Sequence, residues 1–264
     1  MYLDKIIKYK REELEHIRRC VSQKDVEKKA QDAEPPRKFF EAVANPKKDI
    51  RVIAEIKKAS PSAGVIREDF DPFRIAAQYE ENGAVALSVL TDEHFFQGKL
   101  DYLTAIHRQV KLPLLRKDFT LHQYQIYEAR GAGSDAILLI ARILSKDQIK
   151  DYQDLAHELG MACLIEVHEK QELEKLPPKK VGATHASPLL GINNRNLDTF
   201  QTDLTTTEQL GKQVPKGVTL VAESGISTRA DIDRLLQVPV HAFLIGESLL
   251  RQPDPGLALM ELIG

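Results

Sequence analysis

Short apolar runs alternate with helical patterns from residue 50 to the end of the chain, and this alternation limits the possible folds more than any other feature. Strands that are each followed by a helix pair in parallel through right-handed crossovers. Eight such units predict an α/β fold of the closed (β/α)8 TIM barrel type, since an open doubly wound sheet usually has fewer strands and a glycine fingerprint after the first. The expected strands are 50–56, 84–90, 112–116, 135–140, 161–167, 189–193, 218–223 and 241–246.

The segments between these runs carry the end signals of helices. Asp71 and Asp254 each precede a proline, so each is expected to cap a helix whose first residue is that proline. Gly83 and Gly160 stand where a left-handed residue would end a helix. The expected helices are 71–83, 100–110, 121–133, 145–160, 228–237 and 254–264.

The first part of the chain differs from the rest because it is helical without strands. Residues 2–31 are rich in charge and place apolar residues at helical spacing, which predicts one or two amphipathic helices. The Pro35-Pro36 pair ends this region, and 37–45 predicts one more short helix. We therefore expect a single domain of residues 1–264, with a helical extension over 1–48 and the barrel over 49–264.

Composition excludes several classes of protein. The formal net charge is −2, so no general attraction to nucleic acid or to an anionic membrane is expected. Cys20 and Cys163 match no zinc or redox spacing, and the charged start of the chain is no signal peptide. No apolar run approaches the roughly 18 residues that span a membrane. A cytoplasmic protein is expected, whose oligomeric state the sequence leaves open, a monomer included.

No cofactor or metal site is expected. Residues 131–136 match the dinucleotide pattern GxGxxA, but they follow a helix and precede a strand, the reverse of the order that this pattern needs. His94 and His168 lie near strand ends without HxH or HExxH spacing. Neither the glycine pattern nor these two histidines therefore indicates a nucleotide or metal site.

The first expected strand shows how a site could arise in this fold. Val52, Ala54 and Ile56 fall on one face, whereas the other face begins apolar at Ile53 and becomes charged toward Lys57. This gradient is typical of a barrel strand that opens into a site. An edge strand with a surface ion pair is the alternative.

Polar residues recur at the carboxyl ends of the other expected strands, where barrel enzymes carry their active sites. Any one of them could be an ordinary surface charge, but their convergence on one rim indicates a site. They are Glu55, Lys57, Lys117, Asp118, Glu166, Asn193, Arg195, Glu223, Ser224, Gly225, Gly246 and Glu247.

The residue types at this rim suggest acid–base chemistry on an anionic substrate. Lys57 and Lys117 could each serve as a general acid, a partner of an anion or a Schiff-base nucleophile. Glu55 and Glu166 are natural partners in proton transfer, and Arg195 suits a substrate carboxylate. The glycine-bearing loops after the last two strands predict a phosphate site, unless their glycines only make tight turns.

At these residues the chain resembles the indole-3-glycerol-phosphate synthase family of tryptophan biosynthesis, within the ribulose-phosphate-binding barrels. The resemblance implies ring closure of 1-(2-carboxyphenylamino)-1-deoxyribulose 5-phosphate with loss of carbon dioxide and water, by a carbon–carbon lyase that uses no cofactor. It rests on AEIKKASPSAG (54–64), LSVLTDEHFFQG (87–98), LLRKDF (114–119), LIEVH (164–168), GINNRNL (191–197), AESGI (222–226) and FLIGESLL (243–250).

The resemblance implies catalytic roles for five residues. Lys117 would be the general acid that protonates the ketone, and Glu166 would transfer a proton during dehydration. Glu55 and Asn193 would hold the developing hydroxyl, and Lys57 would pair with an anionic part of the substrate.

Binding roles follow in the same way. Ser60 and Arg195 would hold the anthranilate carboxylate, Phe119, Leu138 and Ile140 would wall the aromatic ring, and Glu223 would also contact the substrate. The phosphate would be bound largely by backbone N–H groups of Ser224, Gly225, Gly246 and Glu247.

The sequence departs from the family pattern at ATHASPLL (183–190), where a short insertion or a late strand start is expected, while GINNRN itself is intact. Two other readings remain open at this point. The chain could be another phosphate-binding barrel enzyme, an isomerase or a Schiff-base lyase, or a non-catalytic barrel that binds a phosphorylated ligand.

Overall fold

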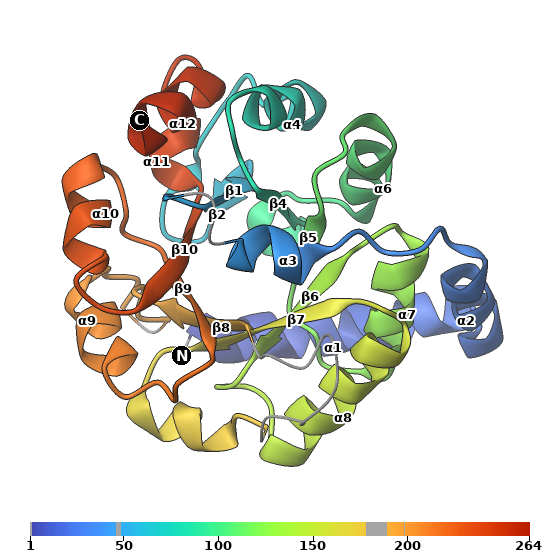
Figure 1. The fold of residues 1–264 in the computed structure, drawn as a ribbon. Coiled ribbons are helices and arrows are strands. Elements are labelled where there is room, and N and C mark those ends of the chain that lie inside the picture. Colours follow the sequence, from blue (N-terminus) through green and yellow to red (C-terminus); the bar gives the residue numbers. More distant parts are fainter. Residues whose placement is uncertain (1, 46–48, 178–188, 198) are drawn as a thin grey trace.

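The computed structural model describes residues 2–45, 49–177, 189–197 and 199–264 and contains a closed barrel of parallel strands (Figure 1). The strand order around the barrel is β1-β10-β9-β8-β7-β6-β5-β4, so the predicted (β/α)8 barrel is confirmed. The barrel strands are β1 (Val52–Ile56), β4 (Ala86–Leu90), β5 (Leu114–Lys117), β6 (Ala136–Ile140), β7 (Ala162–Val167), β8 (Leu189–Asn193), β9 (Thr219–Glu223) and β10 (Val240–Ile245).

Strand β1 shows the two-sided burial that its sequence predicts. Val52, Ala54 and Ile56 pack in the outer core, between the strands and the helices. Ile53 packs in a separate inner core with the interior side chains of the other strands. Because β1 pairs with β10 on one side and β4 on the other, the edge-strand alternative is wrong.

The six predicted helices are present and surround the barrel. Asp71 caps α4 by accepting hydrogen bonds from the N–H groups of Phe73 and Arg74 at 3.0 and 3.1 Å. Asp254 caps α12 in the same way, and Gly83 and Gly160 have φ values of +94° and +78°, as their positions require. These helices are α4 (Pro72–Glu81), α6 (Leu100–Gln109), α7 (Gln123–Gly131), α8 (Lys146–Glu158), α10 (Arg229–Leu235) and α12 (Pro255–Ile263).

After β7, where the alternation predicts a helix, the described chain forms the 3-10 helix η1 (Lys170–Lys175). After β8 lies a helix that the alternation predicts but for which no range was given, α9 (Thr205–Gly211), because its TTTEQLG sequence lacks an apolar period. It is fixed by Asn194, whose Oδ1 accepts from both the backbone N–H and the hydroxyl of Thr207. The loops at the carboxyl ends also contain β2 (Ala59–Ser60), β3 (Gly64–Val65), α5 (Glu93–Phe96) and α11 (Glu247–Leu250).

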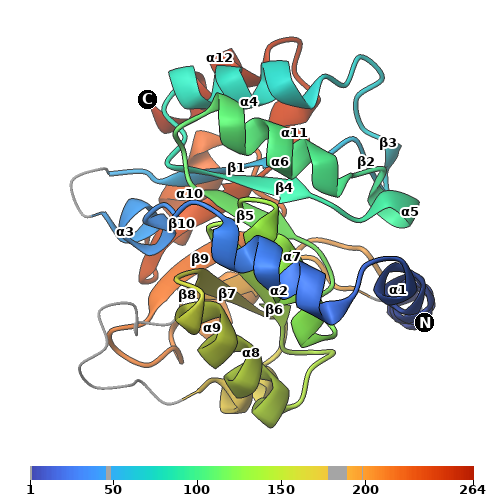
Figure 2. The same ribbon diagram turned by 90° about the vertical axis from the view of Figure 1, so that its right-hand side faces the viewer.

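The N-terminal helices lie at both ends of the barrel and on its side. Figure 2 shows α1 (Tyr2–Cys20) at the right-hand end, beside α5, and α3 (Phe39–Ala44) at the left-hand end. Helix α3 contacts β10 and β4 and adds Phe39 and Val43 to the inner core, so it closes the amino-terminal end. Helix α2 (Gln23–Asp32) packs against α7.

Two further expectations concern the stretch 183–190 and membrane-spanning helices. Residues 183–188 of the departure from the family pattern lie outside the described residues, whereas Leu189–Asn193 form β8. Across the described ranges, no helix combines the length and the apolar character that a membrane crossing needs.

Candidate active site

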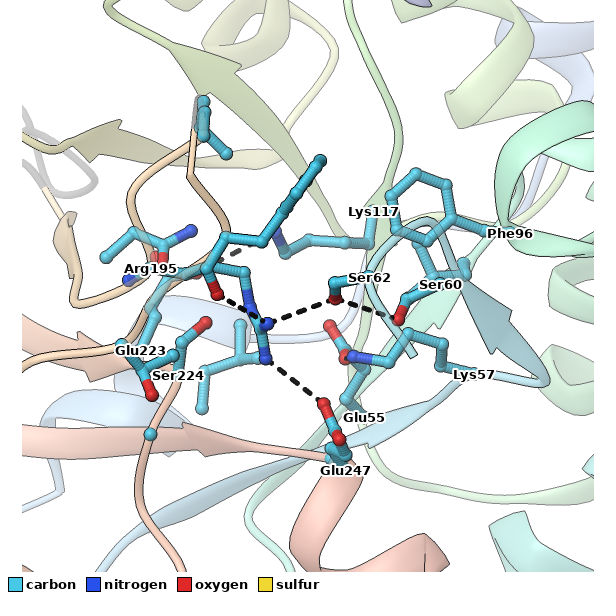
Figure 3. Close-up of a pocket in the computed structure, with 18 of the residues that line it drawn as sticks. Glu55, Lys57, Ser60, Ser62, Phe96, Lys117, Arg195, Glu223, Ser224 and Glu247 are labelled. Carbon is cyan, nitrogen blue, oxygen red and sulfur yellow. Dashed lines mark hydrogen bonds and ion pairs between the residues drawn. The ribbon is translucent and has the colours of Figure 1, made fainter. Parts of the chain in front are cut away.

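A cavity of about 340 Å³ opens at the carboxyl ends of the barrel strands (Figure 3). Helix α1 supplies part of its wall through Leu3 and Ile6. The structure brings all of the predicted site residues together in this cavity: Glu55, Lys57, Ser60, Lys117, Phe119, Leu138, Ile140, Glu166, Asn193, Arg195, Glu223, Ser224, Gly225, Gly246 and Glu247.

Lys117 lies at the centre of the charged part of the cavity. Its Nζ atom is 3.0 Å from Glu166 Oε2 and 3.8 Å from Glu223 Oε2. Burial by itself would lower the pKa of Lys117, but the surrounding carboxylates, Glu166 first, raise it above its ordinary value. At neutral pH the side chain is therefore an ammonium ion, which is an acid and not a nucleophile.

The pKa values of the two carboxyl groups beside Lys117 are shifted in opposite directions. Burial would raise the pKa of Glu166, but Lys117, His168 and a hydrogen bond from Asn193 lower it. The pKa of Glu223 is raised well above its ordinary value by burial and by the nearby Glu166. Two carboxyl groups whose pKa values are pushed apart suit one base and one acid.

Two glycines make room for these carboxyl groups. A Cβ atom on Gly191 of β8 would clash with Glu223 Oε1, so a larger residue there would force the Glu223 carboxyl group to move. A Cβ atom on Gly246 would lie 2.7 Å from Glu55 Oε1. Gly246 has a φ of −139°, so it is required by contact with Glu55 and not by a tight turn. The sequence analysis missed Gly191, although a glycine inside a strand signals a close approach.

The second charged pair is Lys57 with Glu55, whose Nζ and Oε1 atoms are 2.5 Å apart. Both side chains are largely buried at the end of β1. The apolar-to-charged gradient along this strand therefore ends inside the cavity and not on the outer surface.

Arg195 spans the cavity mouth between two loops. Its Nη1 donates to Ser62 Oγ at 3.1 Å, and its Nη2 lies 3.1 Å from Glu247 Oε2. Ser62 in turn lies 3.3 Å from Ser60, so Ser60 reaches Arg195 only through Ser62. Ser62 was missed by the sequence analysis, although it belongs to the same SPS stretch as Ser60.

The loop after β9 has an unusual backbone. Ser224 and Gly225 have φ values of +65° and +74°, and the Asn194 side chain donates to the carbonyl of Ser224 at 3.0 Å. A left-handed serine is uncommon and persists only where the surroundings hold it, often at a ligand site. Gly225 thus makes the turn that was considered as an alternative, within a loop that lines the cavity.

Other lining residues had weak signals in the sequence. Phe96 of α5 faces Phe119, with ring centroids 6.2 Å apart, and extends the predicted apolar wall. Leu3 and Ile6 follow the helical period of α1, but that period does not say which part of the barrel the helix covers. Leu197, Phe200 and Thr202 also line the cavity.

The residues considered for a metal or a nucleotide site in the sequence lie in contacts of a different kind. His94 stacks on Tyr9 of α1, and His168 lies beside Glu166. In the described ranges, no group of three or more His, Cys, Asp and Glu side chains is placed to hold a metal ion. Gly133 of the GxGxxA match has a φ of +91° in the turn before β6.

Solved structures with the same architecture show the fold. A protein named KGPDC from Streptococcus mutans has a TM-score of 0.59 at 8% identity, covering 81% of this chain and 95% of that one. A mutant tryptophan synthase alpha-subunit from Pyrococcus furiosus has a TM-score of 0.59 at 16% identity, covering 82% and 99%.

Sequence comparisons are more specific. A relative from Polaromonas is 48% identical over 267 residues, which cover 99% of this chain and 98% of the relative. A relative from Campylobacter jejuni is 42% identical over 265 residues and the full length of both chains. Both are named indole-3-glycerol phosphate synthase, and the model of that family matches residues 3–262. The resemblance seen in the motifs is thus confirmed over nearly the whole chain, which belongs to the indole-3-glycerol phosphate synthase family.

Proposed function

We propose that this chain closes the indole ring of 1-(2-carboxyphenylamino)-1-deoxyribulose 5-phosphate to give indole-3-glycerol phosphate. As a member of its family it is a carboxy-lyase of tryptophan biosynthesis. The observation that carries the proposal is the buried ammonium of Lys117 between Glu166 and Glu223 in a cavity with an apolar wall.

Lys117 acts in the first step. The ring carbon that bears the carboxylate attacks the ketone carbon, a new carbon–carbon bond forms, and negative charge develops on the ketone oxygen. A preorganised ammonium there stabilises the transition state more than the ground state and donates its proton, which leaves a hydroxyl. The raised pKa of Lys117 ensures that the proton is present when the substrate binds.

Decarboxylation and dehydration follow. The carboxylate leaves as carbon dioxide, and the electrons of the broken bond restore the aromatic ring. The hydroxyl then departs as water while a proton is lost from the ring system. Glu166, whose lowered pKa keeps it ionised, accepts that proton, and Glu55 with Asn193 holds the departing hydroxyl.

The remaining residues bind the substrate. The aromatic ring of the substrate packs against Phe119, Leu138 and Ile140, which lie on the same side of the cavity as Phe96. Lys57 and Glu223 contact the polar groups of the substrate. Backbone N–H groups of the 224–225 and 246–247 loops bind the phosphate. The side chain of Glu247 is paired with Arg195 and Arg251, so only its backbone can serve.

Arg195 and the Ser60–Ser62 pair hold the anthranilate carboxylate until it leaves. The guanidinium group now faces Glu247, so a substrate carboxylate must replace that partner on one side of it. A planar guanidinium suits this exchange because it binds a carboxylate through two parallel hydrogen bonds.

The decisive experiment mixes purified, chelator-treated protein with the carboxyphenylamino-deoxyribulose phosphate and follows indole fluorescence. We expect fluorescence to rise with the wild type and not with Lys117→Ala, while Lys117→Ala still binds the substrate. No rise with retained binding would overturn the proposal. A lysine adduct trapped by borohydride would instead favour a Schiff-base lyase, which the protonated state of Lys117 argues against.

The proposed setting of the reaction is the cytoplasm, with a phosphorylated small molecule as the only partner that the reaction needs. Neither a metal nor an organic cofactor takes part in the proposed steps. Full activity in the presence of chelator is the expected result, and activity that returns only when a divalent cation is added would contradict it.

A further inference from the structure

The carboxylate of Glu166 has two oxygens, and only one of them faces Lys117. The other, Oε1, lies 3.4 Å from Nε2 of His168. Both side chains are almost fully buried, with 2% exposed for Glu166 and 4% for His168. His168 follows Glu166 by two residues, so it points to the same side of the extended chain. It lies behind Glu166, outside the set of described residues that line the cavity.

His168 is itself held by a second carboxylate. Its backbone N–H donates to Oε2 of Glu172 at 2.6 Å, and its Nδ1 lies 3.7 Å from the same oxygen. Glu172 belongs to η1, directly after β7, and is also buried. The imidazole therefore lies between two carboxylates, with Nε2 toward Glu166 and Nδ1 toward Glu172.

We propose that His168, oriented by Glu172, is a positioning residue that holds Glu166 in the geometry needed for proton transfer. The inference rests on the proposed function, because it assumes that Glu166 is the base of the dehydration step. The contact of His168 Nε2 with Oε1 is electrostatic and not a hydrogen bond, and it restrains the rotation of a carboxylate that Lys117 contacts at its other oxygen. Buried carboxylates also need partners for both oxygens, since an unpartnered one carries the full cost of desolvation.

The electrostatics point the same way. Lys117, His168 and Asn193 all favour the ionised form of Glu166, which is the form that accepts a proton. Glu223 opposes them, since it lies beside Glu166 and repels a second negative charge. Without His168, the contributions of Lys117 and Asn193 would remain to favour the ionised form of Glu166 against burial.

Three variants test the proposal by steady-state kinetics. We expect His168→Ala to lower kcat by about 10-fold or more, the scale of losing a partner that orients a reacting group. KM should stay within about twofold, because the groups proposed to bind the carboxylate and phosphate are untouched. His168→Gln should recover most of the kcat, since its amide nitrogen reaches the place of Nε2. His168→Asn should not, since its amide nitrogen takes the place of Nδ1.

The pH profile adds a readout that a merely structural role would not move. Because His168 helps to lower the pKa of Glu166, the acid limb of the kcat profile should shift to higher pH in His168→Ala. The groups that set this limb are Glu166 and its neighbours Lys117 and Glu223, with Glu172 on the far side of the imidazole.

The outcomes separate this proposal from the proposed function. If the wild type does not form indole-3-glycerol phosphate, the proposed function is wrong, and the positioning role of His168 is wrong with it. If the wild type is active and His168→Ala keeps kcat within about twofold, the positioning role is wrong. Equal activity of the Gln and Asn variants would overturn it too. Should His168→Ala fail to fold, that Gln–Asn comparison decides alone.

Discussion

Two buried clusters of charge meet at adjacent residues of β5 and differ in how completely they are paired. The first, here called the anchor cluster, comprises Lys10, Glu13, Asp92, Arg116, Asp118 and Glu128. Lys10 Nζ lies 2.8 Å from Asp92 and 3.1 Å from Asp118, and the guanidinium of Arg116 lies 3.2 Å from Asp118 and 2.8 Å from Glu128. Each ammonium or guanidinium thus contacts at least two carboxylates.

The second, here called the reaction cluster, comprises Lys117, Glu166 and Glu223. Lys117 has one close carboxylate at 3.0 Å and a second at 3.8 Å. Neither oxygen of Glu223 accepts a hydrogen bond from a described residue. The single ammonium group of Lys117 is therefore shared between two carboxyl groups that lie close to each other.

The difference appears in the pKa values. In the anchor cluster, burial would raise the pKa of Asp118, but Lys10 and Arg116 hold it well below its ordinary value. Burial would lower the pKa of Lys10, but Asp118 and Asp92 raise it. The shifts of Lys10, Arg116 and Asp118 all favour the charged form, whereas in the reaction cluster the pKa of Glu166 is lowered and that of Glu223 is raised. A complete set of partners stabilises a fold, and an incomplete one leaves groups that can exchange protons.

The anchor cluster nevertheless affects the cavity. Lys10 belongs to α1, Asp92 lies at the N-terminus of α5, and Asp118 follows Lys117 directly. The cluster therefore holds α1 over the mouth of the barrel, where Leu3 and Ile6 complete the wall.

The largest expected effect separates the two carboxyl groups of the reaction cluster. Glu166→Gln should lower kcat by about 10²- to 10⁴-fold, because an amide cannot accept the proton. Glu223→Gln should cost much less, since an amide resembles the protonated carboxyl group that burial favours there. Parallel kcat measurements check this, and equal losses in the two variants would show that both carboxyl groups act ionised.

Removing Lys10 would break the anchor cluster and leave buried carboxylates without their cation. Lys10→Met should lower the free energy of unfolding by about 3–5 kcal/mol in urea titrations. KM should also rise, because α1 loses its hold on the barrel mouth, while kcat changes less. The exposed Lys5 on the same helix offers a matched control, Lys5→Met. Similar stability of the two variants would contradict the anchoring role.

A smaller effect is expected when the space for Glu223 is filled. Gly191→Ala should lower kcat by between about 10- and 100-fold, because the added methyl group displaces the Glu223 carboxyl group from Lys117. Gly211→Ala in α9 is the matched control, since its methyl group would meet only ordinary contacts. Unchanged kcat in Gly191→Ala would mean that the position of Glu223 does not matter.

The smallest expected effect is on the pH dependence of stability. The folded pKa of Asp118 is depressed, so its contribution is present above the unfolded value of about 3.9 and is lost as pH falls toward the folded value. Between about pH 5 and pH 3, the wild type should therefore lose more unfolding free energy than Asp118→Asn. Asn in place of the exposed Asp69 should leave the slope unchanged. Parallel slopes for all three proteins would refute the assignment.

Local patterns in the sequence were sufficient for much of the fold. Strand burial has a period of two and helix caps depend on a few neighbouring residues, so β1 and the caps at Asp71 and Asp254 could be predicted. Strand ends also follow from these patterns, and in a parallel barrel they all meet at one rim. This is why Lys117 and Glu166, 49 residues apart, could be assigned to one site.

Only the tertiary structure decided how the charges are shared. The helical spacing of Leu3, Ile6 and Leu14 places Lys10 on the buried face of α1, but it does not identify the partners of Lys10, since Asp92 and Asp118 come from other elements. The opposite pKa shifts of Glu166 and Glu223 likewise depend on which group lies nearest to Lys117, and Gly191 matters only because β9 brings Glu223 beside it. Periodicity is a local property of a chain, whereas pairing and burial depend on distances between residues far apart in it.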